Sequence, residues 1–393
     1  MTPKETTSAA DIVTLTFTRL VMNMTRRFSY PFLPEISRQL SVPLDSVQNV
    51  MAVNAGVGVA SPLLGAVGER YGRKRVMMVS LLSIIVASLL GALAPQFALF
   101  AAVMVVFGVA KMIFDPVMSA YIADHVPYVR RGAVVGITEL SWAGSLLVIA
   151  PIAGFLLGTS GLSSVLMVVA LFGVAALVAV YRYLPADHPT GDAAPRRITP
   201  LETWRALRKK PAAFGALGFS LLMVIANETF FINYSAYMES TFNLALTALG
   251  TVTIVVAAAE VFGELSVAGF ADRFGKRRLT LIGAGVSSLS YIVLPLFSSS
   301  LPLTLVTVFV MFLALETAIV ASIPLFTELL PHDRAIMMSA LVGTNSLGRL
   351  AGAVFGGWLY AVLANFPLTT VIVTGIALVS FFLLWRFLPE KQD

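Results

Sequence analysis

Cysteine is absent from this 393-residue sequence, and histidine occurs only three times. Without cysteine the protein cannot form disulfides, use a thiol nucleophile or hold a metal through thiolates. The histidines His125, His188 and His332 all lie in polar connecting stretches, so a multi-histidine metal site is not expected. Charge is scarce as well, because only 12% of the residues are charged, whereas soluble proteins carry about a quarter. Nothing in the sequence indicates an enzyme, a metal site or a cofactor, so none of these is expected.

Apolar residues are abundant: they make up 58% of the chain, and the mean hydropathy is +0.86. Such an excess of apolar surface requires a lipid bilayer around the protein. Apolar runs of roughly 18–25 residues between Pro, Gly or charged breaks predict membrane-spanning helices. We count twelve, with limits near 11–33, 46–68, 76–94, 97–122, 132–157, 162–184, 212–237, 246–270, 279–297, 301–327, 335–362 and 367–388. The predicted fold class is therefore an all-α membrane protein.

Basic residues mark one side of the predicted spans. They gather in RYGRKR after the second span, in RR before the fifth, in RFGKRR after the eighth and in the segment 185–211. The alternate loops carry only Arg38. Because Lys and Arg concentrate on the cytoplasmic side, we expect both termini to be cytoplasmic in a multi-pass protein of the cell (inner or plasma) membrane. The formal charge of +6 is then a topology signal, and no nucleic-acid partner is expected.

The two halves of the chain echo each other at an offset of about 204 residues. The matched landmarks are GERYGRKR (68–75) with ADRFGKRR (271–278), PYVR (127–130) with PHDR (331–334), and Tyr30 and Glu35 with Tyr234 and Glu239. We therefore predict two pseudo-symmetric six-helix bundles, 1–184 and 212–393, joined by a cytoplasmic linker, 185–211. Within the linker, ITPLETWRALRKKP fits either a short amphipathic surface helix or an irregular tether. A repeated bundle around a midplane cavity is the layout of a rocker-switch secondary transporter.

The stretch GAVGERYGRKR (65–75) resembles the signature that follows the second span in the major facilitator superfamily, G-x-x-x-D-R-x-G-R-R/K. Glu69 stands where the family usually has Asp, and the second copy keeps Asp272. Glycine allows a tight turn there, and the acid and the arginines can pair or cap helix ends. The resemblance implies a gate on the cytoplasmic side, whereas the alternative is a basic turn that only sets topology. The candidate gating residues are Gly65, Glu69, Arg70, Gly72, Arg73, Asp272, Arg273 and Gly275.

The fifth predicted span carries a softer resemblance. GITELSWAGSLLVIAPIAGFLLG (136–158) is similar to the antiporter motif of the same superfamily, a run of spaced glycines that ends G-P-x-x-G-G. The motif residues Gly136, Gly144, Pro151 and Gly154 are present, but Ala150 and Phe155 replace two of its glycines. The small residues permit close helix approach and the proline a bend. The resemblance implies a proton antiporter; generic helix packing is the alternative.

Eleven ionisable side chains fall inside the predicted spans, and they are the strongest functional markers of a helical membrane protein. They are Arg19, Arg26, Arg27, Lys111, Arg349, Asp115, Glu139, Glu228, Glu260, Glu264 and Glu316. Arg19, Arg26 and Arg27 share one helical stripe with Asn23 and Tyr30, which must face the protein interior or a wet cavity. Lys111 and Asp115 are one turn apart and can pair.

In the family that the sequence resembles, the first, fourth, seventh and tenth spans line the cavity. This implies that Arg26, Asp115, Glu228 and Glu316 lie there, and the fifth and eighth spans would add Glu139 and Glu260. Asn227, Phe231 and Tyr234 would give Glu228 a polar-aromatic pocket. The candidate substrate and proton-coupling residues are Arg26, Arg27, Tyr30, Lys111, Asp115, Glu139, Asn227, Glu228, Tyr234, Glu316 and Arg349.

Each of these charges can instead form a fixed ion pair that orients helices. We favour that interpretation for Glu260 and Glu264, which are near Arg273 in the sequence, and we expect Arg19 to reach towards the cytoplasm. For Glu228 and Glu316 we favour proton binding, because a carboxyl group in apolar surroundings can hold a proton near neutral pH and a neighbouring arginine opposes this.

The leading hypothesis is a monomeric secondary transporter that exports a small amphipathic compound in exchange for protons, as in the drug-efflux branch of the superfamily. The proton is the coupling ion, and the lipid bilayer and the small-molecule substrate are the partners. The alternative is proton-coupled or facilitated transport of an anionic solute or (lyso)lipid, held by Arg26, Arg27, Lys111 and Arg349. No Walker loop is present in the sequence, so nothing suggests an ATP-driven pump.

Overall fold

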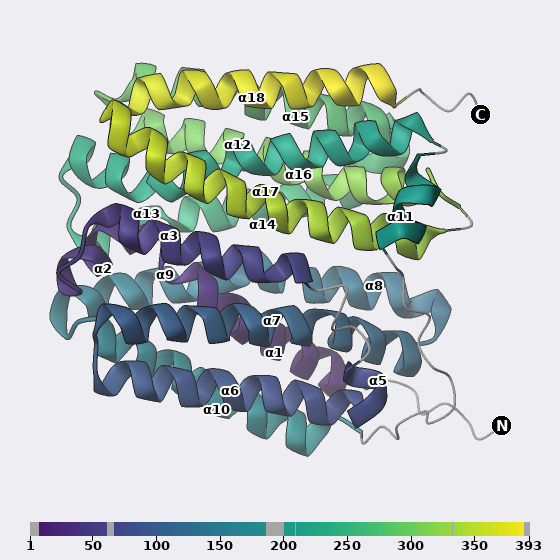
Figure 1. Ribbon diagram of the computed structural model, residues 1–393, viewed down its shortest axis with the longest axis horizontal. Coiled ribbons are helices and arrows are strands. Elements are labelled where there is room, and N and C mark those ends of the chain that lie inside the picture. The colour runs from purple at the N-terminus through teal and green to yellow at the C-terminus, as the bar shows by residue number, and fades with distance from the viewer. Residues whose placement is uncertain (1–7, 61–66, 186–199, 209, 332, 389–393) are drawn as a thin grey trace.

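The structure is a computed structural model that describes residues 8–60, 67–185, 200–208, 210–331 and 333–388. In Figure 1 the long helices lie side by side, with the first half of the chain below and the second half above. The helix α1 (Ala9–Arg27) begins, and α18 (Phe366–Phe387) ends, at the end of the bundle that also holds α11 (Pro200–Leu207). We call this the terminal end. The opposite end holds α2 (Leu33–Gln39) and α13 (Leu246–Val252).

Each half consists of helices that are broken where the sequence places Gly, Pro or polar residues. The N-terminal half comprises α1, η1 (Tyr30–Phe32), α2, α3 (Leu44–Gly56), η2 (Val57–Ala60), α5 (Val67–Tyr71), α6 (Arg73–Leu93), α7 (Phe97–His125), α8 (Tyr128–Glu139), α9 (Ser141–Thr159) and α10 (Leu162–Tyr183). The C-terminal half comprises α12 (Pro211–Phe242), α13, α14 (Ile254–Phe274), α15 (Lys276–Val293), η3 (Leu294–Phe297), α16 (Leu301–Thr327), α17 (Arg334–Leu363) and α18. The all-helical fold class is confirmed.

Ten helical segments within the described ranges are long and apolar enough to cross a bilayer. They correspond to the third to twelfth predicted spans. The first predicted span is α1, whose 19 residues include Arg19, Arg26 and Arg27, too many charges for a lipid-facing helix. The second begins as α3 and η2, and its remainder falls in 61–66, outside the described residues. The first span also ends earlier than predicted, because Pro31 lies in the 3₁₀ turn that follows α1.

The sequence repeat is visible in the backbone. Gly72 precedes α6 with φ 87° and ψ 134°, and Gly275 precedes α15 with φ 84° and ψ 134°. These angles lie in a region that residues with a Cβ rarely adopt, so glycine is required at both turns. The two copies of the motif therefore fold into the same turn.

The basic residues after each of these turns also have equivalent contacts. Lys74 donates from Nζ to the carbonyl oxygens of Tyr181, at 2.9 Å, and Leu184, at 2.6 Å, at the end of α10. Arg277 donates to the carbonyl oxygens of Leu388, at 2.5 Å, and Trp385, at 3.2 Å, at the end of α18. A cation at a helix C-terminus binds its free carbonyl groups and complements the helix dipole.

The two halves are in close contact at the opposite end. A Cβ on Gly154 of α9 would lie 2.5 Å from the carbonyl oxygen of Leu246, and one on Gly250 of α13 would lie 2.5 Å from that of Ala150. These small residues therefore let α9 and α13 touch through their backbones, as the spaced glycines of the fifth span predict.

An arginine bridges the halves at the same end. Arg38 of α2 pairs with Glu35 and with Glu239 of α12, both at 2.8 Å. Glu35 and Glu239 are equivalent positions of the repeat, so one guanidinium holds a carboxylate from each half.

Two glycines at the terminal end lack such close contacts. Among the described residues, a Cβ built on Gly136 of α8 or on Gly343 of α17 would meet no atom within 4 Å outside its own stretch of helix backbone. The α9–α13 contact and the Arg38 pairs therefore have no counterpart at these two positions.

The turn before α15 gives a direct test of the repeat's geometry. Gly275→Ala should lower the free energy of unfolding by about 1–3 kcal/mol through backbone strain, because no described atom crowds a Cβ there. Gly269→Ala is the matched control: that position is helical and equally uncrowded, so alanine should be neutral or stabilise by up to about 1 kcal/mol. Thermal unfolding of the purified protein compares the two. Equal effects of both substitutions would contradict the requirement for glycine at this turn.

Candidate functional site

The site begins at the C-terminal turn of α1, halfway through the bundle. Arg26 and Arg27 occupy that turn, and 7% and 3% of their surfaces remain exposed. Tyr30 follows in η1, where the chain turns away from the helix. The predicted stripe therefore faces the protein interior, as its spacing requires. Two adjacent buried guanidinium groups need acidic partners, because an unpaired charge in a medium of low dielectric constant is costly.

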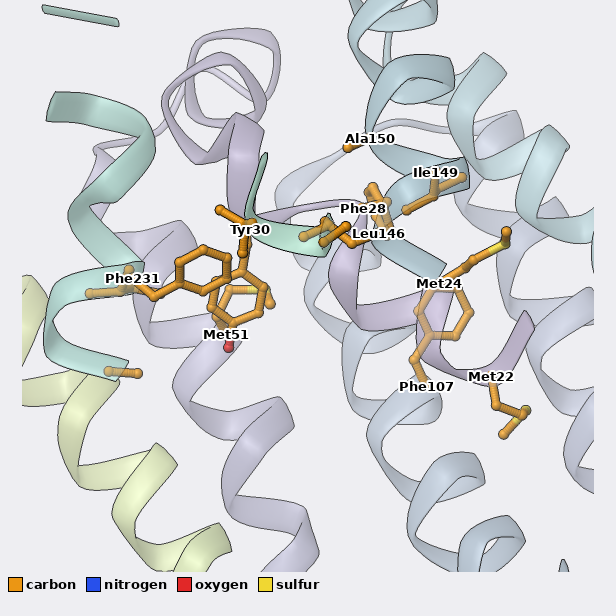
Figure 2. Packing of buried hydrophobic residues seen from close by; sticks show 14 of the residues in the cluster. Met22, Met24, Phe28, Tyr30, Met51, Phe107, Leu146, Ile149, Ala150 and Phe231 are labelled. Atoms are coloured by element: carbon orange, nitrogen blue, oxygen red, sulfur yellow. The ribbon is translucent and has the colours of Figure 1, made fainter. Parts of the chain in front are cut away.

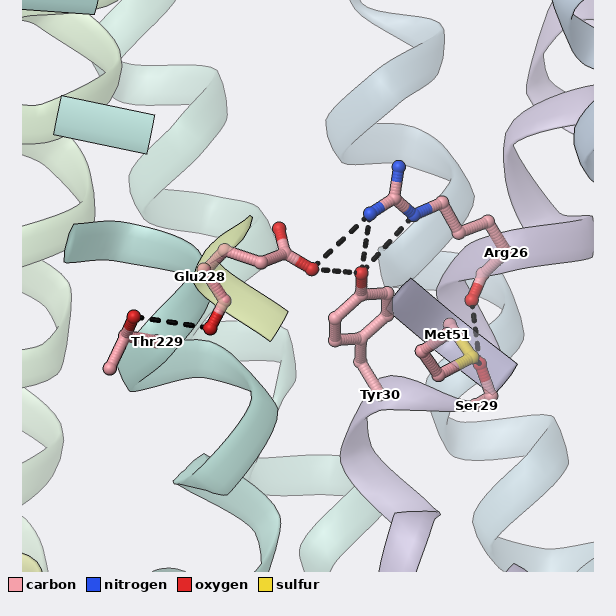
Figure 3. A network of polar contacts seen from close by, with 7 residues as sticks. Arg26, Ser29, Tyr30, Met51, Glu228 and Thr229 are labelled. Atoms are coloured by element: carbon pink, nitrogen blue, oxygen red, sulfur yellow. Dashed lines mark hydrogen bonds and ion pairs between the residues drawn. The ribbon is translucent and has the colours of Figure 1, made fainter. Parts of the chain in front are cut away.

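Arg26, Tyr30 and Glu228 form a triangle that joins the halves (Figure 3). Arg26 donates from Nη2 to Glu228 Oε1, at 3.2 Å, and to the Tyr30 hydroxyl, at 2.5 Å. The Tyr30 hydroxyl itself donates to Glu228 Oε1. The Tyr30 ring stacks on Phe231 with 5.0 Å between ring centroids, and Figure 2 shows the two rings facing each other. Arg26 is thus paired with a buried carboxylate of the other half, that of Glu228.

Arg27 makes a second link between the halves. Its Nη1 and Nη2 atoms each lie 2.8 Å from a different oxygen of Glu260, so the pair is bidentate. Trp142 of α9 completes the arrangement: its carbonyl oxygen accepts from Arg27 at 3.0 Å, and its indole Nε1 donates to Glu260 at 3.2 Å. The guanidinium also lies over the indole ring, 4.3 Å from its centroid. Glu260 is thus in an ion pair, but with Arg27 and not with Arg273, its neighbour in the sequence.

Two further pairs lie entirely within the N-terminal half. Lys111 donates to Asp115 at 2.8 Å, as their one-turn spacing predicts, and to Asn23 at 2.6 Å. Arg19 pairs with Glu139 at 2.6 Å, and the Glu139 side chain is 49% exposed. Arg19 therefore has an acidic partner in α8, which the sequence reasoning did not assign, and its reach towards the cytoplasm stays a prediction.

Four pairs use four of the five basic and four of the six acidic side chains inside the predicted spans. Arg349, Glu264 and Glu316 remain, and none of them has an ion pair or hydrogen bond with a described residue. Glu264 Oε2 is buried without a hydrogen-bond donor. Glu316 packs closely against Gly263 of α14: a Cβ built on this glycine would lie 2.7 Å from the Cβ of Glu316. Both carboxyl groups interact electrostatically with Glu260.

A small cavity of about 50 Å³ lies between the Arg26–Glu228 and Arg27–Glu260 pairs. Its lining residues are Arg26, Arg27, Tyr30, Trp142, Asn227, Glu228, Phe231, Glu260, Phe312 and Arg349. Sites for drug-sized compounds have volumes of roughly 300–1,000 Å³. In this conformation the cavity therefore has room for a small group but not for such a compound.

The predicted site residues divide into two sets. Arg26, Arg27, Tyr30, Asn227, Glu228 and Arg349 line the cavity, whereas Lys111, Asp115, Glu139, Tyr234 and Glu316 do not. Tyr234 is buried among aromatic rings, 5.9 Å from Phe231 between centroids, and its hydroxyl has no partner. The sequence reasoning did not select Trp142, and it judged Glu260 to be structural. The sequence did contain a signal that Glu260 needs a cation from another helix. Glu260 and Glu264 are one helical turn apart on the predicted span 246–270, which contains no Lys or Arg.

A larger cavity of about 630 Å³ lies between α6 and α7. Valines dominate its lining, Val79 and Val109 are exposed, and it contains no acidic residue. A groove of this kind on the outside of a membrane bundle matches a lipid-facing surface. We therefore place the candidate site at the charged cavity.

The motif after the second span makes contacts within its own half. Arg73 donates to the carbonyl oxygen of Ala120 at 2.6 Å and pairs with Asp124, both at the end of α7. Arg70 and Arg273 are exposed. Gly65 and the side chains of Glu69 and Asp272 lie outside the described residues. A gating role for the motif stays a prediction.

Comparison with known proteins gives one family. The model of the Major Facilitator Superfamily matches residues 15–233 and 217–393. The uncharacterized MFS-type transporter YwfA of Bacillus subtilis is 23% identical over 283 residues, 71% of this chain and 68% of that protein. The class C tetracycline resistance protein of Escherichia coli is 25% identical over 241 residues, 60% of each chain.

Among solved structures, a bacterial homolog of the human lysosomal transporter Spinster, in an inward-facing and unoccupied conformation, is similar with a TM-score of 0.77. The match covers 97% of this chain and 98% of that one at 15% identity. At this identity the likeness supports the fold alone.

The pair of Arg27 with Glu260 yields a stability test. Arg27→Gln should lower the free energy of unfolding by about 3–5 kcal/mol, because it leaves Glu260 buried without its cation. Replacing both residues with methionine should be far less costly, since no charge is then stranded. As a control, Arg334→Gln breaks an exposed pair with Glu328 of similar length, 2.7 Å, and should cost only about 0–1 kcal/mol. Thermal unfolding that ranks the double variant with Arg27→Gln would contradict this view of the pair.

Proposed function

Because this chain belongs to the Major Facilitator Superfamily and is therefore a secondary transporter, we propose that it exports a small amphipathic compound in exchange for protons. The similarity to a tetracycline resistance protein supports export of such a compound. Gly154 of the fifth span, which lets α9 approach α13, supports the antiporter assignment. We further propose that it works as a monomer, with the terminal end in the cytoplasm, where the basic loops gather.

The observation that carries proton coupling is the pair of unpartnered carboxyl groups, Glu264 and Glu316. Both lie in the C-terminal half without an ion pair to a described residue; Glu260 repels both, and the guanidinium that attracts both, Arg27, is already held by Glu260. An isolated carboxylate is costly in a medium of low dielectric constant, so a carboxyl group of this kind gains by holding a proton. Ionisable groups of this kind inside a membrane mark proton pathways. We assign proton binding to Glu316, with Glu264 as its neighbour.

The links between the halves suggest how the proton drives movement. With Glu264 and Glu316 protonated, Arg27 has one carboxylate to hold, that of Glu260. When the two acids release their protons, three carboxylates compete for one guanidinium and repel one another. The resulting change in the Arg27–Glu260 link biases the halves between two arrangements, which is what a coupling ion must do. The pair of Arg26 with Glu228 is a second link of the same kind.

The closed end suggests the state in which this cycle is seen. Arg38 and the contact of α9 with α13 close the end opposite the terminal end. With the terminal end in the cytoplasm, closure of the other end supports an inward-facing state. The compound would enter from the cytoplasm, and opening of the other end would require Arg38 to release Glu239.

A second candidate function is uptake or facilitated transport of an anionic solute or lysolipid. Arg349 favours it, because this cation lines the cavity without an acidic partner. This candidate needs no proton gradient, and transport measurements separate the two.

A transport assay tests the leading proposal. A thermal-shift screen of amphipathic cations, anions and lysolipids first identifies a compound that stabilises the purified protein. In proteoliposomes a proton gradient should drive this compound against the direction of proton movement. Glu316→Gln should abolish that accumulation, because glutamine cannot release a proton, while compound-for-compound exchange continues. Glu328→Gln, at an exposed pair on the terminal end, is the control and should transport normally.

Two results would contradict the proposal. Accumulation that is undiminished after an ionophore collapses the gradient would exclude antiport and favour the second candidate. Proton-driven accumulation that survives in Glu316→Gln would exclude this residue as the proton carrier.

A further inference from the structure

Arg349 is the one cavity-lining cation for which the described residues offer no ion pair. It lies in the middle of α17 and reaches the cavity beside Arg26 and Arg27. Its guanidinium carbon lies 5.4 Å from the ring centroid of Trp142, a residue of the other half. The ring face attracts the cation but leaves its five N–H donors available.

The charges that line the cavity do not balance. Three arginines face two carboxylates, and those carboxylates are taken by Arg26 and Arg27. Arg349 is therefore surplus: Arg26 and Arg27 repel it, and Glu228, which attracts it, is already paired with Arg26. A single negative charge from outside the protein would neutralise the surplus.

The backbone holds Arg349 at this place. Gly348 and Gly352 flank it, and α17 approaches α12 so closely that a Cβ on Gly348 would lie 3.1 Å from the Leu221 carbonyl oxygen. A Cβ on Gly352 would lie 2.8 Å from that of Ile225. Glycine at both positions lets the helices touch, which fixes the start of the Arg349 side chain while its charged end stays unbound.

The surroundings of the guanidinium suit an organic ligand. Trp142, Phe231 and Phe312 present aromatic surface to the cavity. Asn227 Oδ1 also belongs to a cavity-lining side chain, and it is buried without a donor. The cavity thus offers a free cation, a free acceptor and apolar rings within one small space.

We propose that Arg349 is a binding site for an organic monoanion, such as an aromatic carboxylate or sulfonate, and that the transported compound carries such a group. The cavity of about 50 Å³ admits the anionic group, which accepts hydrogen bonds from the guanidinium. The apolar part lies against Trp142 and the two phenylalanines once the halves separate around the cavity. The assignment to the transported compound rests on the proposed transport function. It narrows the anion-binding role from four basic residues to one, because Arg26, Arg27 and Lys111 are already paired.

Binding of three matched probes tests this site without any transport measurement. The probes are 1-naphthoate, 1-naphthamide and 1-naphthylmethylammonium, which share a ring system and differ in charge. Titration of the full chain in lipid nanodiscs, followed by tryptophan fluorescence, gives the dissociation constants. The wild type should bind naphthoate more tightly than the other two by about tenfold or more. Arg349→Gln should remove that preference, and Arg349→Lys should retain part of it.

Two controls separate ligand binding from a structural role. Arg386→Gln, at the end of α18, should keep the full preference for naphthoate. The melting temperature of Arg349→Gln should not fall, because the substitution strands no carboxylate and relieves repulsion with Arg26 and Arg27.

Absence of a naphthoate preference in the wild type, or an unchanged preference in Arg349→Gln, would overturn the proposal. A preference that depends on Arg349 in a protein without proton-driven flux would leave this site intact and reject the proposed antiport instead.

Discussion

Two adjacent arginines at the end of α1 each bind a carboxylate from the other half of the molecule, and this constraint organises the centre of the protein. Arg26 holds Glu228, and Arg27 holds Glu260 through two hydrogen bonds. Inside a membrane, breaking either pair leaves a charge without a partner. The halves can therefore separate there only if a proton or another ion compensates that charge. A link of this kind is rigid while paired and responsive when a proton or another ion changes the balance.

The remaining charges follow from this arrangement. Lys111 and Arg19 have acidic partners inside the N-terminal half, which leaves Glu264, Glu316 and Arg349 without an ion pair to a described residue. We propose that the two glutamates bind protons and that Arg349 binds an anion. Proposed coupling and proposed substrate recognition thus share one small region, where each alters the field that the other feels.

The repeat supplies the scaffold around that region. Gly72 and Gly275 adopt the same backbone conformation, and Lys74 and Arg277 bind the ends of equivalent helices. Arg38 joins Glu35 and Glu239, which are equivalent positions of the two halves. The glycine turn and the basic residue that binds a helix end therefore occur in both halves. Arg38 has no such counterpart, and it joins the two halves.

Much of the architecture could be predicted from residue spacing. Apolar runs located the helices, basic loops separated the two ends of the bundle, and the stripe of Arg26, Arg27 and Tyr30 pointed inward. Lys111 and Asp115 were predictable as a pair because they are one turn apart on one helix. The first span ended early, because proline follows α1 within a few residues.

Partners between helices could not be predicted in the same way. Glu260 binds Arg27, which is 233 positions away, and nothing local in the sequence encodes that distance. Trp142 escaped notice because an aromatic residue in an apolar span carries no signal until a cation is placed over its ring. Arg349 was one of four equivalent basic candidates until the pairing of the other three became visible.

The central claim is that protons on Glu264 and Glu316 set the relative positions of the two halves. The chain has no cysteine, so spin labels can be attached at Val135→Cys in α8 and Val342→Cys in α17, two exposed positions in opposite halves. The distance between the labels in lipid nanodiscs, measured at acidic and at alkaline pH by electron spin resonance, tests it most directly. The account predicts that the distance distribution shifts with pH in the otherwise unaltered chain. It also predicts that the shift is lost when both glutamates are glutamine. A distribution that ignores pH, or a shift that persists without the two carboxyl groups, would contradict the account.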